Sequence, residues 1–213
     1  LIAAAGKRDF APVTLPITVN ATLTSTMRTI DTNNVVGVLK GDAKADEYVI
    51  YTAHYDHLGN NGSTEKDGIY NGAVDNATGI AAMLELARAY GKAPAPERSV
   101  LFLAVTAEEK GPLGSEYYAA NPLYPLGKTV AMINMDALAV GGPTHDFTIR
   151  GNQKLDLLDR LVETAKHWQM DYTPDPKPET GGFFRSDHFT LAKRGVPAIS
   201  YGSGQDLVDG GIE

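Results

Sequence analysis

The feature that most constrains the fold is an unbroken apolar stretch, RSVLFLAV, at residues 98–105. Because it lacks polar alternation, it indicates a strand covered on both faces, as in the interior of a parallel sheet. Comparable apolar runs occur within residues 46–57, 128–136 and 196–202, and helical patterns lie between them. This alternation predicts an α/β fold with a mixed, mainly parallel central sheet flanked by helices on both faces.

The segments between these strands carry more local signals. Apolar residues recur at helical spacing in residues 79–91 and 153–170, and the second helix is expected to turn Trp168 inward. The short run at residues 146–152 is expected to be an edge strand. The proline-rich segment at residues 171–182 is expected to be a loop.

The first forty residues have a different pattern. Apolar and polar residues alternate in LPITVNATLT, residues 15–24, which favours antiparallel strands. We therefore expect residues 1–40 to form antiparallel entry strands and residues 41–213 to form the core of one domain, 1–213. The chain begins with Leu1 and its last residues form no closing element, so we expect a fragment truncated at both ends.

Composition narrows the range of possible functions. The 19 basic and 26 acidic residues give a formal charge of −7, which argues against a nucleic-acid partner. There are no cysteines, so a metal site would have to use His, Asp and Glu. No apolar run approaches the ~18 residues of a membrane span.

Residue types that bind metals gather where the predicted strands end. The carboxyl ends of parallel strands meet at one edge of a sheet, so these side chains should converge. Several carboxylates in one crevice repel each other unless cations lie among them, which favours a pair of divalent ions. Imidazole and carboxylate ligands suit zinc, and also manganese or cobalt. The residues concerned are His54, Asp56, His57, Asp75, Glu108, Glu109 and Asp136.

Five segments, which span residues 53–198, together form a specific pattern. They are AHYDH, GAVDNATG, AEEKGPLGSEYY, INMD and SDHFTLAKRGVPA. In this order they resemble the M28 family of zinc aminopeptidases, most closely the bacterial members that carry a protease-associated domain insert. The resemblance implies a zinc-exopeptidase fold of the phosphorylase/hydrolase-like type.

The resemblance implies a role for each matching residue. His54 and Asp136 would bind one zinc ion, Glu109 would bind a second, and Asp75 would bridge the two. Glu108 would bind no metal and would instead act as the general base on a metal-bridging water. The bond between Asp75 and the following residue is expected to be cis, as is usual in the family.

Other residues are expected to support these ligands. Asp56 would fix the ring of His54. His57 is expected near the site, as a supporting or rim residue. Asp187 and His188, in the segment SDH, are also expected to support the site.

Zinc is the expected cofactor, with two ions in the intact enzyme. The family takes a histidine ligand for the second ion from a C-terminal segment that this sequence lacks. His188 is a candidate substitute. We therefore expect one zinc ion, or a weakly bound second one, in this chain, and impaired activity.

The resemblance implies a metal-dependent exopeptidase that removes N-terminal amino acids from peptides. Phe183 and Phe184 are candidate walls of the substrate pocket, and a secreted or periplasmic bacterial location is favoured. One alternative is a glutaminyl-cyclase-like acyltransferase with one zinc, which would cyclise N-terminal glutamine instead of releasing an amino acid. Another is a non-catalytic binding domain of the same fold, against which the retained set of site residues speaks.

Overall fold

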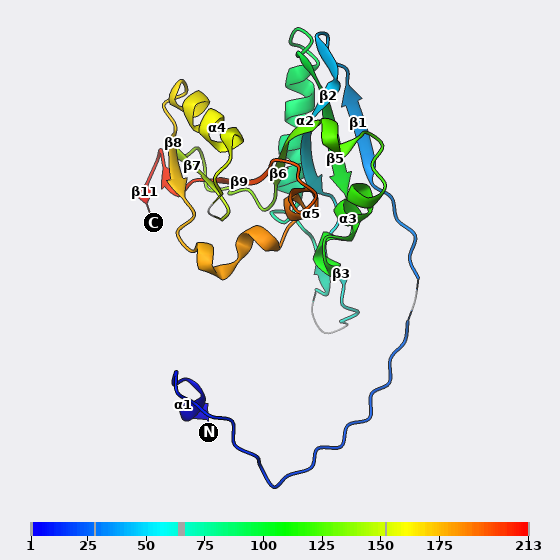
Figure 1. Cartoon of the computed structure of the whole chain (residues 1–213), viewed down its shortest axis with the longest axis vertical. Helices are drawn as coiled ribbons and strands as arrows, with labels where there is room; N and C mark the ends of the chain where they lie inside the picture. The colour runs from blue at the N-terminus through cyan, green and yellow to red at the C-terminus, as the bar shows by residue number, and fades with distance from the viewer. Residues whose placement is uncertain (1, 28, 64–66, 152, 213) are drawn as a thin grey trace. The chain divides into compact units, whose positions relative to one another are not determined.

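The computed structural model describes residues 2–27, 29–63, 67–151 and 153–212 (Figure 1). The chain divides into two compact units, Leu1–Asp31 and Thr32–Glu213. The first unit contains the short helix α1, Ile2–Ala5. The described residues between α1 and Val35 carry no strand, so the prediction of antiparallel entry strands is wrong there. An alternating segment becomes a strand only beside a hydrogen-bonding neighbour, and here the alternating apolar side chains are exposed.

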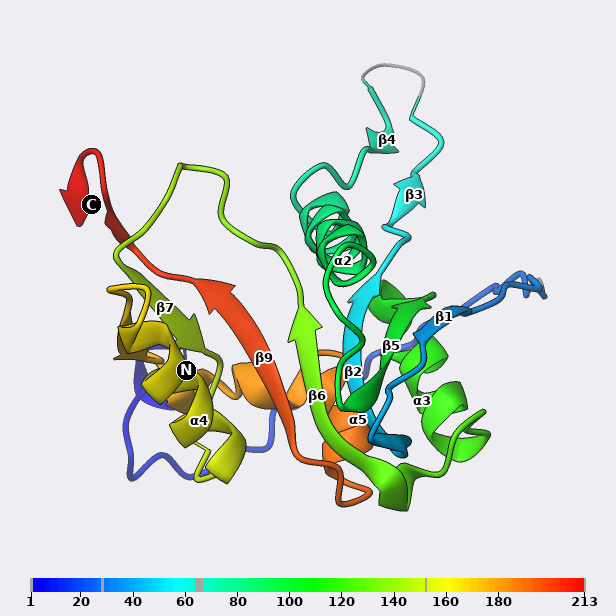
Figure 2. The same cartoon turned by 90° about the horizontal axis from the view of Figure 1, so that it is seen from above.

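The second unit is built on a seven-stranded sheet with the order β1-β5-β2-β6-β9-β7-β8 (Figures 1 and 2). The central pairs β5–β2, β2–β6 and β6–β9 are parallel, as is β7–β8, whereas β1–β5 and β7–β9 are antiparallel. The predicted mixed, mainly parallel sheet is confirmed. The strands are β1 Val35–Leu39, β2 Lys44–His54, β5 Arg98–Val105, β6 Thr129–Met135, β7 Asp146–Ile149, β8 Asp171–Pro174 and β9 Ala198–Ser203.

Two local predictions about this sheet are wrong. Strand β7 is not an edge strand, because β8 pairs with its free side. Strand β8 lies in the segment predicted to be a proline-rich loop, and its last residue is Pro174. Proline has no N–H to donate to a neighbouring strand but is tolerated in an edge strand. A proline-rich composition therefore does not exclude an edge strand.

Helices cover both faces of the sheet (Figure 2). Successive residues of β2 show this, because Ile50 packs in a cluster with Tyr118 of α3 and Leu191 of α5. The next residue, Tyr51, faces the other way and its ring lies 6.1 Å from that of Tyr90 in α2. The helices are α2 Ala77–Tyr90, α3 Leu113–Ala120, α4 Asp156–Lys166 and α5 His188–Ala192.

Short elements complete the fold. Two hairpins are formed by β3 Gly59–Asn60 with β4 Ile69–Tyr70, and by β10 Asp206–Leu207 with β11 Gly211–Ile212. The 3-10 helices are η1 Glu108–Lys110, η2 Leu126–Lys128, η3 Pro178–Thr180 and η4 Gly182–Phe184.

Helix α4 packs through Leu158 and Ala165 against Phe147 and Ile149 of β7. It ends at Lys166, and Trp168 lies beyond it with 78% of its surface exposed, so its predicted inward position is wrong. Within the described ranges, every helix is too short or too polar to cross a membrane.

Candidate metal centre at the carboxyl ends of the strands

The predicted site residues lie where parallel strands end. His54 is the last residue of β2, Asp136 directly follows β6, and Glu108 and Glu109 lie in η1, just after β5. The register pairs His54 with Val105, so the ends of β2 and β5 coincide. Asp75 lies in the loop that leads into α2.

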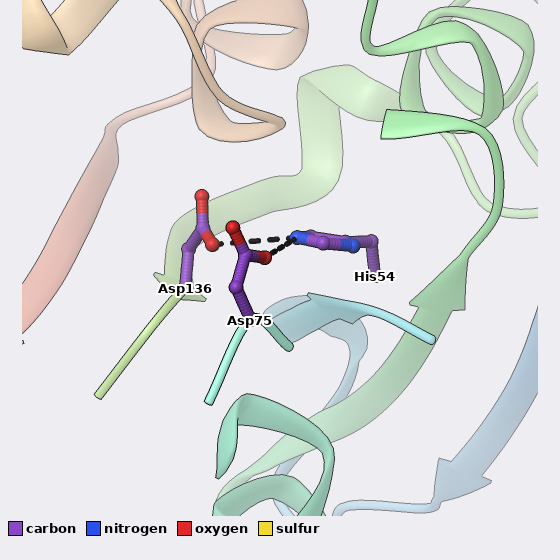
Figure 3. A group of neighbouring side chains, drawn as sticks. All are labelled: His54, Asp75 and Asp136. Carbon is purple, nitrogen blue, oxygen red and sulfur yellow. Dashed lines mark hydrogen bonds and ion pairs between the residues drawn. The ribbon is translucent and has the colours of Figure 1, made fainter. Parts of the chain in front are cut away.

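His54, Asp75 and Asp136 form a first group in which the side chains point toward one another (Figure 3). His54 Nε2 lies 3.0 Å from Asp75 Oδ1 and 3.3 Å from Asp136 Oδ1. The His54 side chain is only 1% exposed. The structure thus brings together three residues that the sequence predicted to be ligands.

The other ring nitrogen of His54 defines its tautomer. Nδ1 lies 2.9 Å from the Asp56 carbonyl, which can only accept, so Nδ1 must donate. Nε2 therefore faces two carboxylates and needs either a proton or a metal ion there. Burial disfavours a charged ring, but the hydrogen bond to Asp136 and its charge outweigh that effect and raise the pKa of His54 to about 9.

Asp136 is held from the side opposite His54. Its Oδ2 accepts a 2.8 Å hydrogen bond from Ser186 Oγ, which in turn accepts one from Asn134 Nδ2 at 2.8 Å. Burial acts to raise the pKa of Asp136, but the hydrogen bonds from His54 and Ser186 prevail and lower it. Asp136 is therefore ionised at neutral pH and fixed in orientation.

Asn76 anchors the loop that carries Asp75. It caps α2 by accepting from the Gly79 amide at 3.0 Å, and its Nδ2 donates to the Met135 carbonyl at 3.0 Å. The contact ties the loop to the end of β6, beside Asp136. The Asp75–Asn76 peptide bond is cis, as the resemblance implied.

A second group consists of His57, Asp75 and Glu109. His57 Nδ1 lies 2.5 Å from Glu109 Oε1, and the two side chains are about one-fifth exposed. His57 Nδ1, Glu109 Oε1 and Asp75 Oδ1 are buried atoms that make no hydrogen bond within the described part of the chain. The sequence predicted His57 as a supporting or rim residue near the site. Its position depends on the path of the irregular segment after β2, which local pattern does not specify.

Glu108 belongs to neither group, although it adjoins Glu109. Burial, with the negative charges of Asp187 and Asp136, raises the pKa of Glu108 to about 7. A carboxyl group with this pKa exchanges protons readily near neutral pH. The two adjacent glutamates thus occupy different environments.

The carboxylate of Asp56 has a different contact from the expected one. Only the backbone carbonyl of Asp56 contacts the ring of His54. Its Oδ2 accepts hydrogen bonds from Thr106 Oγ1 at 2.9 Å and from the Ala107 amide at 2.6 Å. Ala107 has a φ of 57°, so this carboxylate stabilises the left-handed turn that presents Glu108.

Asp187 and His188 are fully buried behind the site. Asp187 Oδ1 accepts from Ser115 Oγ at 2.6 Å, and burial raises the pKa of Asp187 to about 6. Burial lowers the pKa of His188 to about 4, so its ring is neutral at pH 7. Neither residue belongs to a metal-binding group, and the structure gives no support to His188 as a substitute ligand.

The two candidate pocket residues lie apart from both groups. Phe183 packs on the ring of His188 and lines a cavity of about 460 Å³ with Phe189, and Phe184 packs against Phe189. None of the residues of the two groups lines that cavity. A cavity of about 620 Å³ does reach the second group, and its lining includes His57, Tyr70, Asn76, Ile80 and Leu84.

The residues fit divalent metal ions. Carboxylate oxygens and imidazole nitrogens converge with buried atoms that lack hydrogen-bond partners, and a cation satisfies such atoms. A donor set of nitrogen and oxygen without thiolate is compatible with zinc.

The fold and this site define an α/β domain with a histidine–carboxylate centre on the carboxyl ends of its strands. The sequence profile of peptidase family M28 matches residues 34–209, and the chain belongs to that family.

Similar proteins agree with this assignment. A "Probable zinc metalloprotease" of Pyrenophora teres f. teres is 34% identical over 125 residues, which are 57% of this chain and 26% of that protein. An aminopeptidase from Aneurinibacillus sp. strain AM-1 matches with a TM-score of 0.62 and 27% identity, over 80% of this chain and 39% of that one. The Porphyromonas gingivalis glutaminyl cyclase shares the fold, with a TM-score of 0.61 and 19% identity over 84% of this chain and 66% of that one. The chain thus spans well under half of the first two proteins.

Proposed function

We propose that this chain is the catalytic core of a zinc-dependent exopeptidase that removes amino acids from the N-terminus of peptides. The observation that carries the proposal is the convergence of two histidine–carboxylate groups on Asp75, in a chain of peptidase family M28. The similarity to the Aneurinibacillus aminopeptidase supports the direction of cleavage.

Each group of side chains has a role in this proposal. His54, Asp136 and Asp75 would hold one ion, and Glu109 with Asp75 would hold another. Bound zinc would polarise the scissile carbonyl and lower the pKa of water. The buried position of His54 and the hydrogen bond from Ser186 to Asp136 keep the ligands oriented before substrate arrives.

Glu108 is the proposed general base. Its carboxylate would take a proton from the attacking water and deliver it to the leaving nitrogen as the C–N bond breaks. A pKa of about 7 suits both halves of this transfer, because near neutral pH the carboxylate can accept a proton and the carboxylic acid can release it. The Asp56 contact to the Ala107 amide positions the turn that carries this carboxylate.

The test compares the zinc-loaded chain with E108Q on leucine p-nitroanilide and on its N-acetylated form. We expect release of leucine only from the free amine, and a roughly 10²–10⁴-fold lower kcat in E108Q with unchanged zinc content. E116Q is the matched control, because Glu116 pairs with Lys193 and Arg194 at the surface. Full activity in E108Q would exclude Glu108 as the base, and inactivity of the zinc-loaded wild type would overturn the function for this chain.

A glutaminyl-cyclase-like reaction is the second candidate. It is favoured by the likeness to the Porphyromonas gingivalis enzyme, a likeness that at 19% identity concerns the fold. Incubation with a peptide that begins with glutamine separates the two reactions by product mass. Loss of ammonia with retention of the residue would identify a cyclase, whereas free glutamine would identify the exopeptidase.

A further inference from the structure

We propose that His57 Nδ1 is a direct ligand of the second metal ion, which it binds together with Glu109 and Asp75. This inference rests on the proposed metal-dependent function and deepens it. It assigns a nitrogen ligand to the second ion, for which the sequence offered His188 as the candidate.

The first argument is geometric. One ligand atom from each of His57, Asp75 and Glu109 lies within 4.8 Å of the other two, which is a separation that one shared ion can span. The carboxylate of Asp75 belongs to this group and also to that of His54, so the two groups adjoin.

The second argument is that the atoms lack other partners. His57 Nδ1 lies 2.5 Å from Glu109 Oε1, and Asp75 Oδ1 lies 3.0 Å from His54 Nε2. Beyond these contacts, the three atoms of His57, Glu109 and Asp75 make no hydrogen bond among the described residues. Buried polar atoms nearly always make hydrogen bonds, so three such atoms without one are compatible with a cation bound between them. A protonated His57 paired with Glu109 is the competing explanation, and the metal content of H57A separates the two.

The third argument is how the chain brings the Asp75 loop against His57. Gly72 has a φ of 65°, and a Cβ placed there would lie 3.0 Å from His57 Cβ and 3.0 Å from the Asp75 carbonyl. Glycine is therefore required both by the backbone conformation and by the close approach. The imidazole also meets the Tyr70 ring edge-on, with centroids 6.3 Å apart. The imidazole thus packs against both the loop of Asp75 and an aromatic ring.

His188 is the alternative nitrogen ligand, and its surroundings argue against it. Both of its ring nitrogens lack partners among the described residues, but the ring is fully buried under Phe183, with centroids 4.9 Å apart. It belongs to neither group of converging ligand atoms. His57 is the nitrogen donor that the fold presents to Glu109.

Equilibrium dialysis against zinc, followed by metal analysis, provides the first test. We expect two ions per wild-type chain and one per H57A chain, with the second dissociation constant raised more than about 100-fold, above the range for residues that only support ligands. The matched control, H167A, removes an exposed histidine at the end of α4 and should keep both ions. Circular dichroism in EDTA should show equal folding of all three proteins.

A second test reports ligation directly. The chain has no cysteine, so H57C would introduce its only thiol. Because Nδ1 is close to the Cβ and metal–sulfur bonds are longer than metal–nitrogen bonds, the thiolate should nearly reach the same ion. Cobalt-loaded H57C should show a thiolate-to-cobalt charge-transfer band that cobalt-loaded H167C lacks.

The outcomes separate this inference from the proposed function. Two ions in H57A, or one in both wild type and H57A, would overturn the role of His57 and leave the exopeptidase proposal standing. A missing charge-transfer band in H57C that carries two cobalt ions would also overturn it. No bound metal in the wild type would overturn the metal-dependent function itself.

Discussion

Replacing Asn76 with alanine tests whether its side chain holds the Asp75 loop against the end of β6. Asn76 is 2% exposed, and its Nδ2 donates to the Met135 carbonyl at 3.0 Å. Its Oδ1 accepts from the Gly79 amide at 3.0 Å and from the Ala137 amide at 3.2 Å. One side chain therefore caps α2 and joins the Asp75 loop to the end of β6.

The cost of this substitution follows from those three hydrogen bonds. Loss of the helix cap costs about 1 kcal/mol. The Met135 carbonyl becomes a buried acceptor without a partner, which costs roughly 2 kcal/mol, and the partly buried Ala137 amide adds about 1 kcal/mol. We expect N76A to lower the free energy of unfolding by about 3–4 kcal/mol, a large share of the stability of a typical domain.

Urea unfolding followed by circular dichroism in EDTA measures this loss without a contribution from metal binding. N121A is the matched control, because Asn121 is an exposed asparagine at the end of α3 whose Nδ2 reaches only the Tyr117 carbonyl at 3.3 Å. We expect N121A to stay within about 0.5 kcal/mol of the wild type. A loss below about 1 kcal/mol in N76A would refute the idea that Asn76 holds the loop and the strand together.

Two further predictions concern Glu108 and Ala137. The pKa of Glu108 is raised from 4.5 to about 7, so between these pH values the folded protein keeps a proton that the unfolded chain releases. The stabilisation that this proton gives at low pH is therefore lost as the pH rises from 4.5 to about 7. In metal-free buffer E108Q should therefore gain stability relative to the wild type between pH 5 and 7, and a constant difference would contradict the raised pKa. Ala137 has a φ of 52°, a conformation that costs an L-residue about 1 kcal/mol, so A137G should be up to ~1 kcal/mol more stable in urea unfolding. A destabilised A137G would show that this strain is absent.

The sequence predicted the interior strands of the sheet well, because a strand buried on both faces has an uninterrupted run of apolar residues. The run at residues 98–105 coincides with β5, and the metal-binding residue types after β2, β5 and β6 do meet at one edge. These features depend on neighbouring residues and on the parallel direction of the strands.

The wrong predictions depend on partners distant in sequence. Residues 15–24 alternate like a strand but have no hydrogen-bonding neighbour in the described chain, and β7 was placed at an edge because its pairing with β8 is not encoded locally. Trp168 fits the helical period, yet α4 ends at Lys166 and Gln169 reverses the chain at a φ of 57°. The position of His57 likewise follows from the irregular segment after β2 and from the approach of the Asp75 loop.

The two groups of candidate metal ligands differ in how rigidly the fold holds them. Substitutions of His57 and of Asn76 should therefore have different effects. His54 and Asp136 lie at strand ends and are almost fully buried, whereas His57 lies in an irregular segment and Glu109 in a short 3-10 helix, and both are about one-fifth exposed. Ligands fixed before binding lose less conformational entropy on binding. Asp75 is shared, so the Asn76 anchor serves both groups, while His57 serves only one. In the proposed two-ion centre, removing His57 would therefore affect the second ion alone, and removing Asn76 would perturb the loop that serves both groups.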